Sequence, residues 1–286
     1  MVRGHQIVPT HGKRVTDVLK GMLRPSLMAA PGSRLVTADW SAIEARVNPW
    51  LSNCAAGDAK LDLFRTGEDI YEVNASATFG VAVADVDDAQ RQVGKVQELA
   101  CGFGGAVGAF NAMGRIYNVL LPEAQSRRMV DAWRRANPWA VKQWSDLEQA
   151  YTLAMRQPGR EFTAGRVTYL YDGQHLWYAL PSGRVLCYPY ARFDRDGISY
   201  AKAAWKPAQD AKEWPRARLW HGLACENIVQ ATANDLLRDA LRRLDAEGLE
   251  VVLHVHDEIV LEGGENAAAA LKDIMTTPPA WASGLP

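Results

Sequence analysis

The sequence predicts an α+β fold in which strands near both ends of the chain enclose a mostly helical insertion. An apolar run, RLVTAD, ends at Asp39, and a second, EVVLHVHDEIVLE, surrounds Asp257. Both are rich in β-branched residues and meet turn residues, as strands do. Most of the chain between them carries apolar residues at helical spacing.

The first elements follow from local signals. The Pro31-Gly32 turn leads into a strand over residues 34–39, followed by a short apolar helix and a helical segment over residues 57–80. A cluster of aspartates at 85–88 precedes a long helix that begins near Gln90, where acids favour the positive end of the helix dipole. Pro122 then opens another helix, which Asn137-Pro138 breaks.

The second half of the chain begins with strand signals. Residues 162–190 are rich in Tyr, Val and Leu around a Pro-Ser-Gly turn, which predicts a β-hairpin. A helix is expected from about Leu223 to Ala246, with Gly248 as its stop. Residues 250–262 then form two short strands joined at His256-Asp257.

The composition is that of an ordinary soluble globular protein. Its 286 residues allow one large domain or two smaller ones, with 48% hydrophobic and 23% charged residues. We see neither the roughly 20 apolar residues of a membrane helix nor a secretory segment, so we expect a cytoplasmic protein with no membrane partner. The four cysteines form no CxxC pair, and the net charge of −1 gives no argument for a polyanionic partner.

Asp39 and Asp257 occupy equivalent positions, each where an apolar strand meets a turn. An unpaired carboxylate on a buried strand is costly, so each needs a metal or a basic partner. Alone, either could be a cap or a salt-bridge residue. If the two strands lie side by side, the repulsion between the carboxylates, to which Glu258 adds, would be relieved by Mg²⁺. Two such ions about 4 Å apart would form the clamp used in displacement at phosphorus.

His254 and His256 offer an alternative metal site. Strand alternation would place both on one side of the strand, where they could bind a transition metal. No third nitrogen or sulfur ligand is near them in the sequence, which disfavours this interpretation.

Arg91 and Lys95 lie one helical turn apart, and Leu99 and Phe103 continue the same predicted face. Such a helix could hold a triphosphate at one end and a base at the other. The alternative is an exposed face with neighbouring acids. Gly94 costs about 1 kcal/mol in a helix relative to Ala, so we expect something to approach its backbone closely. Further glycines follow at 102, 104 and 105.

Together these segments resemble the polymerase region of family A DNA polymerases, the bacterial DNA polymerase I and phage replicase group. DWSAIEAR (39–46) is similar to motif A, RQVGKVQELACGFGG (91–105) to motif B and HVHDEIV (254–260) to motif C. ENIVQATANDLL (226–237) resembles the helix that precedes motif C. The resemblance runs from about Leu35 to the end of the chain.

The resemblance implies catalytic roles for the matching residues. Asp39 and Asp257 would ligate two Mg²⁺ ions, for which Mn²⁺ can substitute, and Trp40 would add its backbone carbonyl. Arg91 and Lys95 would grip the phosphates of the incoming dNTP, with Lys95 as the proton donor to departing pyrophosphate.

It also implies contacts with the sugar, the base and the primer–template DNA. Glu44 would lie under the sugar and exclude a 2′-hydroxyl, while Phe103, with Leu99 before it, would face the nascent base pair. The DNA-facing residues would be Arg46, Gln230 and His256, with Glu258 beside them supporting the metal site. Three positions depart from the usual residues of the family. Leu99 stands where many members have Phe or Tyr, and Phe103 and Trp40 each stand where Tyr is usual. Such replacements suit a divergent phage lineage.

The implied fold is an antiparallel palm sheet built from residues 1–54 and 220–286, with helical fingers over 55–219. Only 38 residues precede Asp39, and we recognise no thumb or exonuclease among them. The expectation is a split or truncated phage-type polymerase in the bacterial or phage-infected cytosol, with a separate chain as a candidate source of thumb and exonuclease.

The expected activity is addition of dNMP from dNTP to a primer 3′-OH. The alternative is a catalytically silent DNA-binding or assembly module that depends on a partner chain. A metal-dependent phosphohydrolase would also use the acidic residues, but that function gives no role to Glu44, Arg91 or Lys95. A single-subunit RNA polymerase is disfavoured by Glu44.

Overall fold

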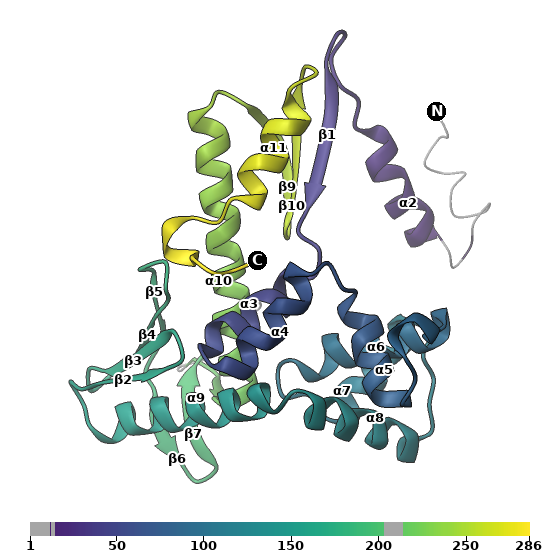
Figure 1. The fold of residues 1–286 in the computed structure, drawn as a ribbon. Coiled ribbons are helices and arrows are strands. Elements are labelled where there is room, and N and C mark those ends of the chain that lie inside the picture. Colours follow the sequence, from purple (N-terminus) through teal and green to yellow (C-terminus); the bar gives the residue numbers. More distant parts are fainter. Residues whose placement is uncertain (1–11, 13–14, 203–213) are drawn as a thin grey trace. The chain divides into compact units, whose positions relative to one another are not determined.

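The computed structural model describes residue 12, residues 15–202 and residues 214–286 (Figure 1). The rest of the predicted N-terminal palm segment, residues 1–11, 13 and 14, lies outside the described residues, as do residues 203–213 of the predicted fingers. The chain forms two compact units, one of residues 1–40 with 240–277 and one of residues 41–239 with 278–286. The predicted domain boundaries at 54/55 and 219/220 stay predictions.

The smaller unit contains a three-stranded antiparallel sheet in the order β1-β10-β9. These strands are β1 (Arg34–Asp39), β9 (Glu250–Val255) and β10 (Glu258–Gly263). The predicted strand pair joined at His256-Asp257 is confirmed, and His256 takes a φ of 55° in this two-residue turn. The sheet therefore brings the two ends of the sequence together in adjacent strands.

One face of this sheet is covered by α11 (Ala267–Thr276), which packs on β1 and β10. Ile259, Leu261 and Leu271 are fully buried there. Earlier in the chain, α2 (Val15–Leu23) and η2 (Arg24–Ser26) precede the sheet. The apolar contacts of β10 thus fix the strand that begins at Glu258, directly after Asp257.

The larger unit begins with helices that follow one another in the sequence, as the labels in Figure 1 show. They are α3 (Ile43–Ser52), α4 (Ala55–Arg65), α5 (Ile70–Phe79), η3 (Val83–Asp85), α6 (Asp88–Cys101), α7 (Val107–Ile116), α8 (Glu123–Ala136) and α9 (Pro138–Arg156). The predicted single helical segment over 57–80 is two helices, because Asp69 caps α5 by accepting hydrogen bonds from the Tyr71 and Glu72 amides. The breaks at Pro122 and Asn137-Pro138 are confirmed.

The insertion also contains two small antiparallel sheets, and not only helices. The first has β2 (Glu161–Ala164), β3 (Val167–Tyr171), β4 (Leu176–Ala179) and β5 (Val185–Tyr188) in sequence order. The predicted hairpin over 162–190 is its β4–β5 half; a second hairpin precedes it, because Gly165 allows the tight β2–β3 turn at φ 57°. The second sheet has β6 (Arg192–Asp194), β7 (Gly197–Ala201) and β8 (Arg216–Arg218).

A long helix, α10 (His221–Ala246), follows these sheets and ends before Gly248, which takes a φ of 71° as a helix stop. The division between the two units falls within this helix, after Asp239. The chain ends with η4 (Ala280–Ala282) in the larger unit. In the described parts of the chain, no helix combines the length and hydropathy needed to cross a bilayer.

Candidate active site

Three acidic residues meet at one end of the β1-β10 pair. Asp39 is the last residue of β1 and is paired in register with Glu258, the first residue of β10, and Asp257 immediately precedes Glu258. Burial raises the pKa of Asp257 above its usual value, and the charges of Asp39 and Glu258 raise it further. The register of β1 and β10 therefore confirms the expected proximity of Asp39 and Asp257, and the charge of Asp39 disfavours ionisation of Asp257.

The expectation that Asp39 ends a buried strand is wrong. Asp39 is exposed and Asp257 is half-buried; β1 and β9 contain only exposed and half-buried residues, and the buried positions of the sheet lie in the central strand β10. A desolvation cost therefore does not force Asp39 to find a partner. Mutual repulsion between adjacent carboxylates is the property that favours a cation here.

Two contacts position the residues that flank these acids. The Trp40 indole Nε1 donates to the Met275 backbone oxygen at 2.7 Å, which ties the residue after Asp39 to α11. The Glu258 carboxylate accepts from Arg24 Nη2 at 2.7 and 2.9 Å. Glu258 is therefore already paired with a cation, which leaves Asp39 and Asp257 as the carboxylates that can receive another.

The donor set at this edge fits a hard divalent cation. It consists of oxygen atoms only, from the Asp39 and Asp257 carboxylates, and Mg²⁺ prefers such ligands. His256 does not continue β9, because its left-handed backbone places it in the turn, so it does not share a strand face with His254. Among the described residues, no group of three or more His, Cys, Asp or Glu side chains is arranged to hold a metal.

The cation at position 91 is paired with acids of α5. Arg91 Nε and Nη2 donate to Asp69 Oδ2 at 2.9 and 2.5 Å, and Glu72 lies 3.8 Å away. Burial acts to raise the pKa of Asp69, but hydrogen bonds from Arg91 and from the Tyr71 amide lower it below its usual value. The alternative of a helix face with neighbouring acids therefore describes the surroundings of Arg91.

Lys95 is held by aromatic rings. Its Nζ lies 4.6 Å from the centroid of the Tyr117 ring and 5.9 Å from that of Tyr71, and the Arg91 guanidinium lies 5.4 Å from the Tyr71 centroid. An aromatic face attracts a cation without cancelling its charge. Lys95 is thus positioned while remaining able to attract an anion.

The predicted helical face that runs from Arg91 to Phe103 ends early. α6 begins at Asp88, with a capping box between Asp87 and Gln90, and ends at Cys101. Phe103 lies in the following turn, where Gly104 takes a φ of 74°, a conformation that glycine adopts readily. Leu99 remains on the helix and is half-buried, so Leu99 and Phe103 do not continue one regular face.

The expected close approach to the backbone of α6 is confirmed at Gly94. A Cβ atom there would lie 2.0 Å from the backbone oxygen of Tyr71 on α5. Any side chain would therefore push the two helices apart. The glycine is required by helix packing within this unit.

Glu98 anchors α6 from its other side and was not singled out from the sequence. Its Oε2 accepts from Asn74 Nδ2 at 2.7 Å, Trp133 Nε1 at 3.0 Å and Lys60 Nζ at 3.5 Å, all buried. Burial lowers the pKa of Lys60, and the Glu98 charge opposes that shift. The network joins α4, α5, α6 and α8, and it therefore fixes the helix that carries Arg91 and Lys95.

Glu44 and Gln230 come together from distant parts of the sequence. Glu44, in the first turn of α3, accepts a hydrogen bond from Gln230 Nε2 of α10. Arg46, on the same helix as Glu44, lies 4.4 Å from the Phe64 ring centroid and donates from Nε to the Ser41 oxygen at 2.9 Å. Burial lowers its pKa.

The predicted site residues thus fall into three local groups. The smaller unit brings together Asp39, Asp257 and Glu258; the larger unit pairs Glu44 with Gln230 and surrounds Arg91 and Lys95 with Asp69, Tyr71 and Tyr117. The contacts of Arg91 and Lys95 with Asp69, Tyr71 and Tyr117 were not predicted. Asp69 was recognisable as a helix cap from its position before the apolar run, but its pairing with Arg91 depends on how α5 packs on α6.

Comparison with known proteins gives concordant matches. The sequence profile of DNA polymerase family A matches residues 6–279. A DNA polymerase of Bacillus phage SP02 is 38% identical over 279 residues, covering 96% of this chain and 42% of the phage protein. The thermostable DNA polymerase I of Thermus aquaticus is 26% identical over 253 residues, covering 87% of this chain and 25% of that enzyme.

A solved structure shares the fold. The POL domain of Pol1 from M. smegmatis, in complex with DNA primer-template and dNTP, superposes with a TM-score of 0.58 at 18% sequence identity. The match covers 88% of this chain and 38% of that one. The chain therefore spans less than half the length of each of these relatives.

Proposed function

This chain belongs to DNA polymerase family A, and we propose that it carries out template-directed DNA synthesis, adding dNMP from a dNTP to a primer 3′-OH. The proposal is supported above all by Asp39 and Asp257, which lie at one end of two adjacent antiparallel strands, where Asp39 pairs in register with Glu258, the residue after Asp257. Motifs A, B and C all lie within the residues that the family profile matches.

Asp39, Asp257 and the carbonyl of Trp40 would hold two Mg²⁺ ions, or Mn²⁺ in their place. The oxygen-only donor set and the repulsion between the two carboxylates favour such ions at this position. When bound, the ions would lower the pKa of the primer hydroxyl and neutralise charge on the phosphates. Glu258, paired with Arg24, would support the site without being a ligand.

Arg91 and Lys95 would bind the triphosphate, and Lys95 would donate a proton to the departing pyrophosphate. Arg91 is oriented by Asp69, whose hydrogen bond raises the Arg91 pKa and keeps the guanidinium charged. Lys95 rests on the Tyr117 ring, which holds the ammonium group and leaves its charge available. Preorganised cations of this kind stabilise the charge of a transferring phosphoryl group.

Glu44 would face the deoxyribose and exclude a 2′-hydroxyl. Its carboxylate is oriented by Gln230, which supports a fixed position for this contact. Leu99 and Phe103 would pack near the nascent base pair. Arg46, Gln230 and His256 would contact the primer–template DNA, as would Glu258, the first residue of β10.

The test is primer extension with a labelled primer–template, dNTPs and Mg²⁺ at low salt, because phosphate contacts weaken as salt rises. Asp257→Ala is compared with Asp245→Ala, an exposed aspartate of α10. We expect extension by the wild type and by Asp245→Ala, and none by Asp257→Ala.

Two results would overturn the proposal. If Asp257→Ala extended the primer as well as the wild type does, Asp257 would have no part in the reaction. DNA binding by the wild type, measured by fluorescence anisotropy, without any extension would favour the silent DNA-binding module.

A further inference from the structure

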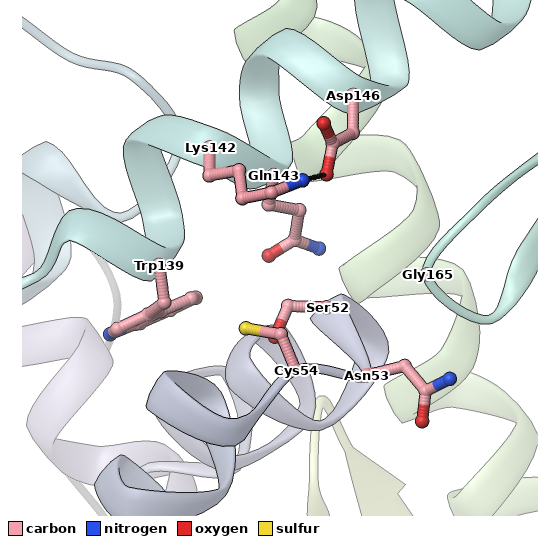
Figure 2. Close-up of a pocket in the computed structure, with 8 residues that line it drawn as sticks. All are labelled: Ser52, Asn53, Cys54, Trp139, Lys142, Gln143, Asp146 and Gly165. Atoms are coloured by element: carbon pink, nitrogen blue, oxygen red, sulfur yellow. Dashed lines mark hydrogen bonds and ion pairs between the residues drawn. The ribbon is translucent and has the colours of Figure 1, made fainter.

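A polar pocket of about 260 Å³ lies in the larger unit, between the α3–α4 junction, helix α9 and the β2–β3 turn (Figure 2). The two charged side chains that line it, Lys142 and Asp146, lie 2.5 Å apart and neutralise each other. The Gln143 amide, which Figure 2 shows near them, is buried. The pocket therefore presents a ligand with neither a free charge nor an accessible Gln143 amide.

In the smaller unit, by contrast, a single arginine is placed to control a charged site. Arg24, in η2, donates from Nη2 to both oxygens of the Glu258 carboxylate, at 2.9 and 2.7 Å. Glu258 lies opposite Asp39 in the strand register and directly follows Asp257. Three carboxylates therefore meet at this end of the β1-β10 pair, and Arg24 engages one of them.

The strand register makes Glu258 a potential third ligand of the proposed cation site. Residues directly opposite each other on antiparallel strands project from the same face of the sheet, so Glu258 shares a face with Asp39. Among the residues that the structure describes, however, no three acidic side chains are arranged to hold a metal. The pairing with Arg24 accounts for this, because it directs the Glu258 carboxylate to the guanidinium.

The segment that follows Arg24 fixes its position. The Ala30 amide donates to Glu262 Oε1 at 2.6 Å, and Glu262 lies four residues after Glu258 on the same strand. Residues 24–30 are therefore attached to β10 at both ends, each time through a carboxylate. Arg24 is held beside Glu258 in this way although its own side chain is 73% exposed.

The pair matters more for charge than for stability. Ion pairs with one partner this exposed contribute little to the free energy of unfolding. The Glu258 side chain, in contrast, is only 15% exposed, and it lies beside two further acids. A guanidinium that remains charged at any working pH is suited to hold such a carboxylate permanently in one direction.

We propose that Arg24 is a positioning residue that keeps Glu258 out of the cation site and thereby sets which cation the site prefers. The inference rests on the metal site assigned to Asp39 and Asp257 under the proposed function. A site with two carboxylates suits Mg²⁺, which usually takes one or two of them together with substrate phosphates. A third carboxylate would favour Ca²⁺, which takes six to eight oxygen ligands in flexible geometry.

The experiment measures Ca²⁺ and Mg²⁺ binding to the full chain by isothermal calorimetry, without DNA or nucleotide. Arg24→Ala frees the Glu258 carboxylate, and the double variant Arg24→Ala with Glu258→Gln removes its charge again. Arg34→Ala is the matched control, because Arg34 is an exposed arginine at the opposite end of β1 from Asp39.

We expect the ratio of the Ca²⁺ to the Mg²⁺ association constant to rise at least about tenfold in Arg24→Ala, since affinity for Ca²⁺ follows the number of charged ligands. The added Glu258→Gln should abolish this rise, and Arg34→Ala should bind as the wild type does. Arg24→Lys, which keeps the charge without the planar fork, should give a smaller rise in the same direction. Thermal unfolding without metal checks that each variant is folded.

Three results would overturn the proposal. The first is an unchanged ratio in folded Arg24→Ala, or in folded Arg24→Lys if the alanine variant does not fold. The second is a rise that persists after Glu258→Gln, because Glu258 would then not be the added ligand. The third is an equal rise in Arg34→Ala, because the loss of any nearby positive charge would then suffice.

The titrations contain no primer, template or dNTP, so they can be separated from the test of the proposed function. An unchanged ratio together with extension that depends on Asp257 would refute the role of Arg24 alone. An unchanged ratio together with extension that does not depend on Asp257 would mean that the metal site itself is wrongly assigned.

Discussion

Arg91 Nη2 lies 2.5 Å from Asp69 Oδ2, so the cation proposed to meet the triphosphate already has an anionic partner on the neighbouring helix. Asp69 has a second task, because the same carboxylate caps α5. Both interactions involve groups near the surface, where ion pairs contribute little to stability. The pairing therefore matters more for the charge that a nucleotide meets than for the fold.

Asp69→Asn separates these two tasks, since asparagine caps helices as well as aspartate does. Removing the negative charge should strengthen the attraction of Arg91 for phosphate. We expect the KM for dNTP to fall several-fold, with a smaller change in kcat, in steady-state primer extension. Asp62→Asn, which breaks the exposed Asp62–Arg65 pair, is the control and should change neither constant. A raised KM in Asp69→Asn would show instead that the carboxylate is needed to aim the guanidinium.

Selection of the sugar should depend on the contact between Glu44 and Gln230. In Glu44→Ala the carboxylate that would oppose a 2′-hydroxyl is absent, so the ratio of ribonucleotide to deoxyribonucleotide incorporation should rise at least about tenfold, equivalent to roughly 1.4 kcal/mol. Gln230→Ala keeps the carboxylate and should give a smaller rise. Competition between rNTP and dNTP on one primer–template measures both. An unchanged ratio in Glu44→Ala would exclude this residue from sugar selection.

The buried acid Glu98 should dominate the stability of the helical region. Glu98→Ala leaves the Lys60 ammonium buried without its partner, and breaking such a pair costs about 3–5 kcal/mol. The double variant Lys60→Met with Glu98→Leu should lose less than Glu98→Ala. Urea unfolding followed by tryptophan fluorescence measures these free energies. Glu123→Ala, which breaks an exposed pair with Arg127, should stay within about 0.5 kcal/mol of the wild type.

Local signals were sufficient to predict the strand that ends at Asp39 and the two strands on either side of Asp257, because apolar runs rich in β-branched residues meet turn residues at these points. They also placed the breaks at Pro122 and at Asn137-Pro138. The end of α6 at Cys101 was missed, since Leu99 and Phe103 keep the helical spacing after the backbone has left the helix. Sequence spacing does not reveal that Gly104 adopts a positive φ.

The surroundings of the site residues depended on tertiary packing, which sequence patterns do not contain. Asp39 belongs to an apolar strand, yet it is exposed at the end of an outer strand of the sheet. The partners of Arg91 and Glu98 come from other helices and were not predicted. The motif residues themselves were recognisable because three ordered segments resemble motifs A, B and C of the family to which the chain belongs.

The cysteines should differ sharply in reactivity. Burial raises the pKa of Cys101 and of Cys225 to about 12, so both thiols stay protonated below that pH, and the thiolate is the nucleophile. At pH 8 iodoacetamide should therefore modify Cys54, which is half-buried, well before Cys101 and Cys225. Peptide mass spectrometry over time measures the rates, and denatured protein should react at every cysteine. Equal rates in the native protein would contradict the burial of these thiols.

The contact between Gly94 and the Tyr71 carbonyl leaves no room for even a methyl group between α5 and α6. We therefore expect the two helices to move together. A displacement of α6 must carry Asp69 and Tyr71 of α5 along, so Arg91 keeps its acidic partner as it moves. Such a movement would change the position of the Arg91 guanidinium and preserve its pairing with Asp69.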